Sequence, residues 1–152
     1  MSDQTVTIRK MLPASCEEVF DAWLDPEGMC QWMCPGPVTS SEVTLEPHVG
    51  GHFRIVMNAP HAKFVNTGEF RVLDRPRTLK FTWVSSRMSN EETLVTVELH
   101  RRGVDCELVL THERVPQEHS APELQGGWGA IVGKLGKHIV QRRPTINSLQ
   151  HS

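Results

Sequence analysis

Hydrophobic and polar residues alternate with a period of two over most of this chain. The alternation runs from Thr5 to Lys10 and returns from about Ser41 to Glu113. A period of two is typical of strands with one buried face. Glycine, proline and asparagine positions divide the second region into expected strands at 42–47, 51–59, 64–74, 78–84, 92–101 and 104–113. The pattern therefore predicts one N-terminal strand and a six-stranded antiparallel meander.

Three other segments have the period of a helix. Ser15 and Glu18 are spaced as a capping box at the start of the first, and Asp25 followed by Pro26 predicts the start of a second short helix. The third runs from the Pro122 region to Arg143, with apolar positions at Trp128, Ile131, Val132, Leu135 and Ile139. This long helix contains five glycines, each costing about 1 kcal/mol against alanine, and we interpret them as sites of close approach to the sheet.

The order of these elements predicts an α+β fold in which the helices cover one face of the sheet. Parity within each expected strand places on the covered face Phe53, Ile55, Met57, Phe70, Val72, Leu79, Phe81, Trp83, Val95, Val97, Leu99, Leu108, Leu110 and His112. The opposite, solvent-facing parity carries His52, Arg54, Glu69, Arg71, Lys80, Thr96, Glu98 and Glu107.

Composition narrows the class of protein. With 152 residues, 38% hydrophobic and 22% charged, the chain is long enough for one core and is not of the disordered type. A formal charge of −2 without a basic run argues against nucleic acid as a partner. No apolar run is long enough for membrane insertion, and the N-terminus does not resemble a secretory signal, so we expect a cytoplasmic protein. Its four cysteines are expected to be reduced thiols there.

Several strings in this order and spacing resemble the homologues of the C-terminal domain of the activator of the ninety-kilodalton heat-shock protein ATPase, within the START-like (SRPBCC) superfamily. They cover most of the chain and include Val19-Phe20-Asp21-Ala22-Trp23, Asp25-Pro26-Glu27, Gly50-Gly51-His52-Phe53, Thr67-Gly68-Glu69-Phe70, Leu79-Lys80-Phe81-Thr82-Trp83, Leu108-Val109-Leu110-Thr111-His112-Glu113 and Gly127-Trp128.

The resemblance implies a helix-grip (START/Bet v-like) fold: a curved antiparallel sheet of about six or seven strands, two short N-terminal helices and a long C-terminal helix over the sheet. It implies a single domain over residues 1–143, and we expect 144–152 to form a flexible tail. Relatives use the cavity between helix and sheet for lipids, hormones or polyketides, so a hydrophobic small molecule or lipid-like ligand is the expected partner. A chaperone partner is the alternative, although that link belongs to longer proteins with an additional N-terminal domain.

The candidate ligand-binding residues are those whose parity and helical spacing direct them between the sheet and the long helix. They are Trp32, Phe53, Met57, Phe70, Trp83, Val97, His112, Trp128, Val132 and Leu135. The same residues could instead fill an ordinary core.

His112 is the one titratable side chain on this apolar face, and three roles stay open for it. It could be a core histidine bonded to neighbouring groups, a polar anchor for a ligand, or a general base.

Three functions are then open: binding of a hydrophobic small molecule without an assigned reaction, a chaperone-type interaction module, or a cyclase or dehydratase using His112 with a carboxylate such as Glu113. Edge strands at 42–47 or 5–10 offer a route to a homodimer.

Neither a cofactor nor a metal is expected. Cys30 and Cys34, followed by His48 and His52, match the spacing of a Cys2His2 zinc site by count. Such sites place the two histidines one helical turn apart, whereas Gly50-Gly51 separates them here. We therefore interpret these residues as semi-buried thiols and solvent-facing imidazoles.

The entrance to the cavity is expected near the C-terminal helix and the loop at 60–63.

Overall fold

The structure, a computed structural model, describes residues 3–86 and 90–142. Its elements in chain order are β1 (Gln4–Leu12), α1 (Cys16–Ala22), α2 (Pro26–Trp32), β2 (Ser40–Leu45), β3 (His52–Ala59), β4 (Ala62–Asp74), β5 (Thr78–Ser85), β6 (Glu92–Arg102), β7 (Asp105–Val115) and α3 (Ala121–Arg142). The strands form one seven-stranded sheet in the order β1-β7-β6-β5-β4-β3-β2. The predicted helix-grip architecture is confirmed, while the segment 144–152 lies outside the described residues.

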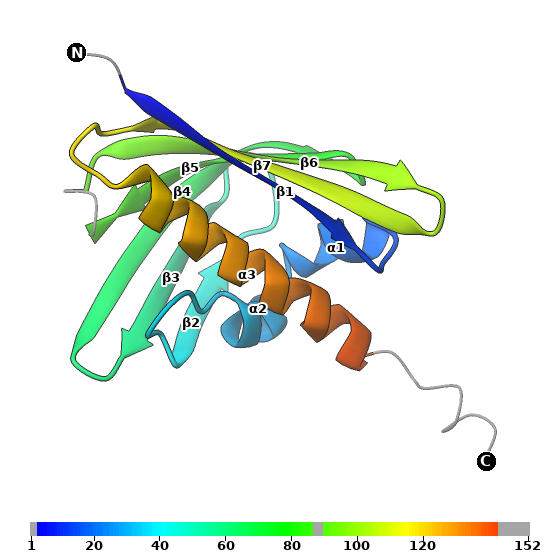
Figure 1. The fold of residues 1–152 in the computed structure, drawn as a ribbon, viewed down its shortest axis with the longest axis horizontal. Coiled ribbons are helices and arrows are strands. Elements are labelled where there is room, and N and C mark those ends of the chain that lie inside the picture. Colours follow the sequence, from blue (N-terminus) through cyan, green and yellow to red (C-terminus); the bar gives the residue numbers. More distant parts are fainter. Residues whose placement is uncertain (1–2, 87–89, 143–152) are drawn as a thin grey trace.

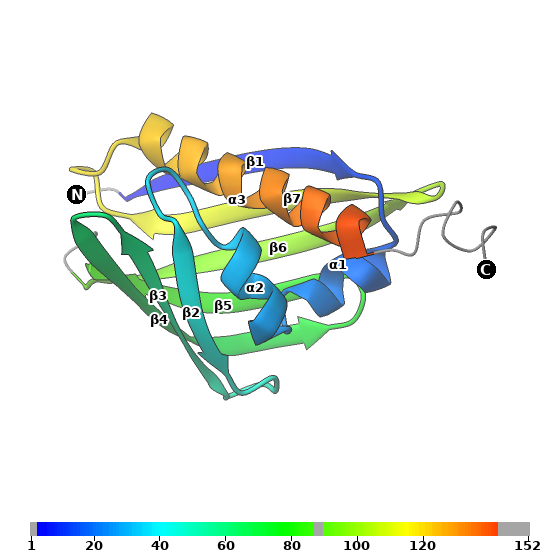
Figure 2. The ribbon, with the colours of Figure 1, turned by 90° about the horizontal axis from the view of Figure 1, so that it is seen from below.

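The sheet is strongly curved, and all three helices lie on its concave side (Figure 1). α3 crosses this side diagonally, and α2 lies between α3 and the β2 edge (Figure 2). α1 lies near the end of the molecule where β6 turns into β7. The inner face of the sheet is therefore covered by helices, and its outer face is left to solvent.

Local sequence explains where the helices begin. Ser15 is the N-cap of α1: its side chain accepts a hydrogen bond from the Glu18 amide at 3.1 Å, and the Glu18 carboxylate accepts one from the Ser15 amide at 3.0 Å. This confirms the predicted capping box. Asp25 is the N-cap residue of α2, but its side chain makes no capping bond. It accepts instead from Arg142 at 2.9 Å and so connects the start of α2 to the end of α3.

The predicted inner face is the core with one exception. Val72, which simple alternation placed inside, is 37% exposed. The register of β4 against β5 shifts between Phe70 and Val72, and an extra residue in one strand reverses the parity of the residues after it. Leu73 consequently packs against the core in its place.

The glycines of α3 have more than one role, so the predicted close approach holds for only part of them. A Cβ atom at Gly136 would lie 3.1 Å from Leu12 Cδ2, and one at Gly127 would lie 3.7 Å from Pro35 Cβ. A Cβ at Gly126, Gly129 or Gly133 would meet nothing within 4 Å. Close packing therefore explains Gly136, whereas these three lower helix stability without a steric reason.

Two glycines, Gly68 with close neighbours and Gly133 without any, test how far steric contact limits an added side chain. Gly68→Ala in β4 should lower the free energy of unfolding by about 2 kcal/mol or more, because the added Cβ would clash with the Thr82 carbonyl oxygen and with Phe53 Cζ. Gly133→Ala in α3 should raise it by up to about 1 kcal/mol. Urea unfolding followed by tryptophan fluorescence measures both, and destabilisation by Gly133→Ala would contradict the open surroundings of that position.

Candidate functional site

A buried chain of hydrogen bonds joins α3 to the middle of the sheet. Trp128 Nε1 donates to His112 Nδ1 at 3.0 Å, and His112 Nε2 lies 2.7 Å from Thr93 Oγ1. Thr93 Oγ1 in turn donates to the carbonyl oxygen of Trp83 at 2.6 Å. An indole N–H can only donate, so Nδ1 must be the acceptor and Nε2 must carry the proton. The chain thus assigns His112 to the neutral Nε2–H tautomer.

Burial and bonding together define the state of His112. Its side chain is fully buried, and desolvation lowers its pKa to about 4. Both ring nitrogens already have protein partners. In this conformation the ring therefore has no nitrogen free for a ligand or for a reacting proton, and its bonding is that of a core histidine.

A small cavity lies beside this chain, under the first turns of α3. Its volume is ≈ 100 Å³. Apolar side chains form its walls, namely Pro35, Met57, Trp83, Leu124, Trp128 and Ile131. Polar groups and a backbone glycine complete the lining, namely Asn66, Ser85, His119, Ser120, Glu123 and Gly127. Because Ser120 and Glu123 are exposed, this side of the cavity opens to solvent.

A second, much smaller cavity lies on another side of Trp83, deeper in the core. It has a volume of ≈ 10 Å³ and is lined by Trp23, Met29, Met33, Leu45, Phe53, Ile55, Phe70, Phe81 and Trp83. This is no larger than the space that one water molecule needs. Trp23 Nε1, a donor on a residue that lines it, has no hydrogen-bond partner within the described chain.

The structure brings some of the predicted binding residues together and separates others. Met57, Trp83 and Trp128 line the larger cavity, and Phe53 and Phe70 line the smaller one with Trp83. The remaining five, which are buried but line neither cavity, are Trp32, Val97, His112, Val132 and Leu135. Hairpin residues 60–63, the expected entrance, do not line the larger cavity either, and its exposed side lies at the start of α3.

Sequence reasoning missed the polar side of the cavity. Asn66 and Ser85 are both 2% exposed, and they share the inward parity of Phe70 and Trp83 on their strands. Extending the same alternation by a few residues would have found them. His119 and Glu123 come from the end of a loop and the first turn of α3, and no periodic signal marks them.

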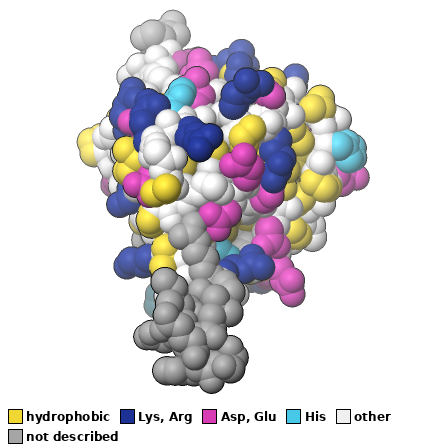
Figure 3. Space-filling model, turned by 90° about the vertical axis from the view of Figure 1, so that its right-hand side faces the viewer, with side chains coloured by type: hydrophobic (Ala, Val, Ile, Leu, Met, Phe, Trp, Pro, Cys, Tyr) yellow, Lys and Arg dark blue, Asp and Glu magenta, His cyan; other side chains and the backbone are white. Residues whose placement is uncertain are grey.

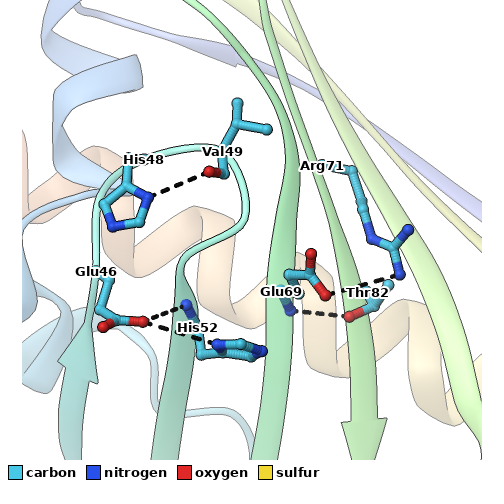
Figure 4. Close-up of polar contacts among 7 residues, drawn as sticks. All are labelled: Glu46, His48, Val49, His52, Glu69, Arg71 and Thr82. Atoms are coloured by element: carbon cyan, nitrogen blue, oxygen red, sulfur yellow. Dashed lines mark hydrogen bonds and ion pairs between the residues drawn. The ribbon is translucent and has the colours of Figure 1, made fainter.

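The outer face of the sheet carries a broad open groove of ≈ 590 Å³, and several polar groups along it are bonded to one another (Figure 4). The Glu46 carboxylate accepts from the His52 amide at 2.8 Å, and this bond is the main cause that lowers the pKa of Glu46. On the next strands, the Glu69 amide donates to Thr82 Oγ1 at 2.9 Å, and Arg71 lies 3.9 Å from the Glu69 carboxylate. These contacts are typical of a solvated sheet surface.

Charge does not accumulate on the face that includes the β6–β7 turn. Figure 3 shows acidic, basic and apolar side chains interspersed there. Arg102 is paired with Glu107 at 2.8 Å and Arg75 with Asp21 at 2.8 Å. This face therefore offers no strip of one charge to a nucleic acid backbone.

The residues with zinc-like spacing do not form a cluster. Cys30 Sγ bonds the Pro26 carbonyl oxygen at 3.2 Å, whereas His52 Nδ1 lies 3.7 Å from the Glu46 carboxylate. Within residues 3–86 and 90–142, no group of three or more histidine, cysteine, aspartate or glutamate side chains could hold a metal ion. No helix in the same part of the chain is long and apolar enough to cross a membrane.

Comparison with known proteins assigns the family. Residues 13–139 match the family described as Activator of Hsp90 ATPase homolog 1-like protein, and the chain therefore belongs to this START-like family. A search of curated proteins gave no match.

Solved structures share the fold at low sequence identity. A protein from Rhodobacter sphaeroides superposes with a TM-score of 0.80 at 21% identity, over 91% of this chain and 93% of its own. One from Chromobacterium violaceum gives a TM-score of 0.79 at 19% identity, over 89% and 96%. CalU16 from Micromonospora echinospora gives 0.68 at 23% identity, over 90% and 76%. At these identities the likeness shows the helix-grip fold alone.

The bonding of His112 predicts how stability depends on pH. The unfolded chain binds a proton at this side chain below about pH 6.5, whereas the folded chain does not until about pH 4. The free energy of unfolding should therefore fall as pH is lowered through this window, by about 3 kcal/mol from this group alone. Urea unfolding between pH 7 and 4 measures this fall in the free energy of unfolding. His100→Gln, which replaces an exposed histidine, is the control and should show the same fall. A His112 ring that protonates near pH 6.5 by NMR would contradict the prediction.

Proposed function

We propose that the protein binds a hydrophobic small molecule in the cavity under the first turns of α3. The observation that carries the proposal is the pairing of two indole rings, Trp83 from the sheet and Trp128 from the helix, with ring centroids 5.1 Å apart beside a cavity with a polar side. Aromatic walls supply apolar contact, and a few polar groups fix orientation, which is the usual design of a small-molecule site. Membership of a START-like family supports the same role.

The size of the cavity limits the ligand. An apolar cavity of about 150 Å³ holds a benzene molecule, and the volume here is ≈ 100 Å³. A ring-sized ligand therefore needs either a small outward shift of α3 or a part that extends past Ser120 and Glu123 into solvent. The glycines at 126 and 129, which cost helix stability without packing contacts, make the first half of α3 the part suited to such a shift. A lipid-sized ligand would need a larger rearrangement.

The description of the matching family favours a second candidate, interaction with a chaperone-type protein partner. Such a partner would contact the outer surface and leave the cavity unused. The cyclase or dehydratase alternative has less support, because the two nitrogens of His112 are bonded to Thr93 and Trp128.

Filling the cavity should weaken binding. Leu124 is a half-buried wall residue, so Leu124→Trp should occupy the space and reduce the affinity for small aromatic probes at least about tenfold. Native mass spectrometry of the freshly purified protein and NMR titration of the indole N–H signals measure binding. Val104→Trp is the matched control, since Val104 is 89% exposed in the β6–β7 turn. Equal probe binding by Leu124→Trp and the parent chain would place the ligand elsewhere.

A further inference from the structure

The lining of the cavity under α3 includes an acidic side chain but neither lysine nor arginine. Glu123 is the one carboxylate among its lining residues. Glu123 also forms no ion pair with any other residue that the structure describes. Its placement in the first turn of α3 suits the helix dipole, but it leaves the carboxylate free to meet a ligand.

A second acceptor lies deeper in the same cavity. Asn66 is 2% exposed, and its amide nitrogen donates one long bond, 3.4 Å, to the carbonyl oxygen of Ile55. No side chain or backbone group within the described ranges donates to its amide oxygen. This oxygen is not among the fully buried side-chain atoms that lack a hydrogen-bond partner. It is an acceptor on a residue that lines the cavity, and a ligand N–H or O–H can donate to it.

The aromatic walls favour the same sign of charge. The indole N–H of Trp128 is already bonded to His112, so this side chain has only its ring left to interact with a ligand. Trp83 adds a second indole ring close by. The face of an indole is the most attractive aromatic surface for an organic cation, and the attraction grows where water is excluded.

We infer that the ligand class is a small aromatic amine, bound with its ring against Trp83 and Trp128 and its ammonium group toward Glu123 and Asn66. The inference rests on the proposed function, because it specifies which ligand the same cavity takes. A carboxylate-bearing ligand would be rejected, since it would place its charge beside Glu123 with no lysine or arginine of the lining to balance it.

Three probes of nearly equal size test the charge preference: benzylamine, benzyl alcohol and benzoate. Binding is followed by NMR at the indole N–H signals of the four tryptophans, at about pH 8. Benzylamine should bind about tenfold more tightly than benzyl alcohol. Benzoate should bind most weakly. Equal affinities, or a preference for benzoate, would overturn the inference and leave the proposed function standing.

Variants at one position separate charge from shape. Glu123→Gln should reduce the ratio of the benzylamine and benzyl alcohol affinities from about tenfold to about threefold, the preference that the indole rings alone supply. Glu123→Lys should make benzoate the preferred probe. Glu118→Gln removes an exposed carboxylate outside the cavity and should keep the original ratio. A preference for benzylamine that survives Glu123→Lys would overturn the inference. Failure of all three probes to shift any indole signal would instead overturn the proposed function.

Discussion

The position of α3 on the sheet depends on the hydrogen-bond chain from Trp128 through His112 and Thr93 to the Trp83 carbonyl. In this chain every donor has one acceptor, so the tautomer of the ring and the rotamer of the threonine are both determined. A buried network of this kind costs little when complete and much when one member is lost. It ties the helix to the sheet at Trp128, and the cavity lies beside this point, under the first turns of α3.

The aromatic residues around this chain show why the fold leaves so little room. Trp23 packs edge-on against Trp32 with centroids 5.0 Å apart, and Phe53 contacts Phe81 edge-on at 5.5 Å. Such contacts add to the stabilisation from burial, and they close the deep end of the space between helix and sheet. The space that remains open lies toward the start of α3, where the lining changes from rings to small and polar groups.

Most of the fold could be predicted from the sequence, because both periodicities are regular and the caps are clear. The order of elements, the capping box at Ser15 and nearly all of the inner face were predicted correctly. The error at Val72 came from the shift in register after Phe70, which alternation alone cannot show. The cavity was less predictable: parity identifies which side chains face inward, but whether they fill the space depends on rotamers. Trp32 and Leu135 thus face inward yet line neither cavity, whereas Asn66 lines one.

Trp83 belongs both to the buried hydrogen-bond chain and to the walls of the two cavities, so it affects stability as well as the size of ligand that fits. Its backbone carbonyl is held by Thr93, so the strand itself is fixed at this point. Its indole forms part of the wall of both cavities. Room for a ligand larger than the present cavity can therefore come from two directions. α3 can shift outward, which strains the bond between Trp128 and His112, or the Trp83 ring can turn and connect the two spaces, which leaves that bond intact. The second route preserves the buried hydrogen-bond chain, but it breaks the ring contacts of Trp83 with Phe53 and Phe81, whose centroids lie 5.9 and 6.3 Å away.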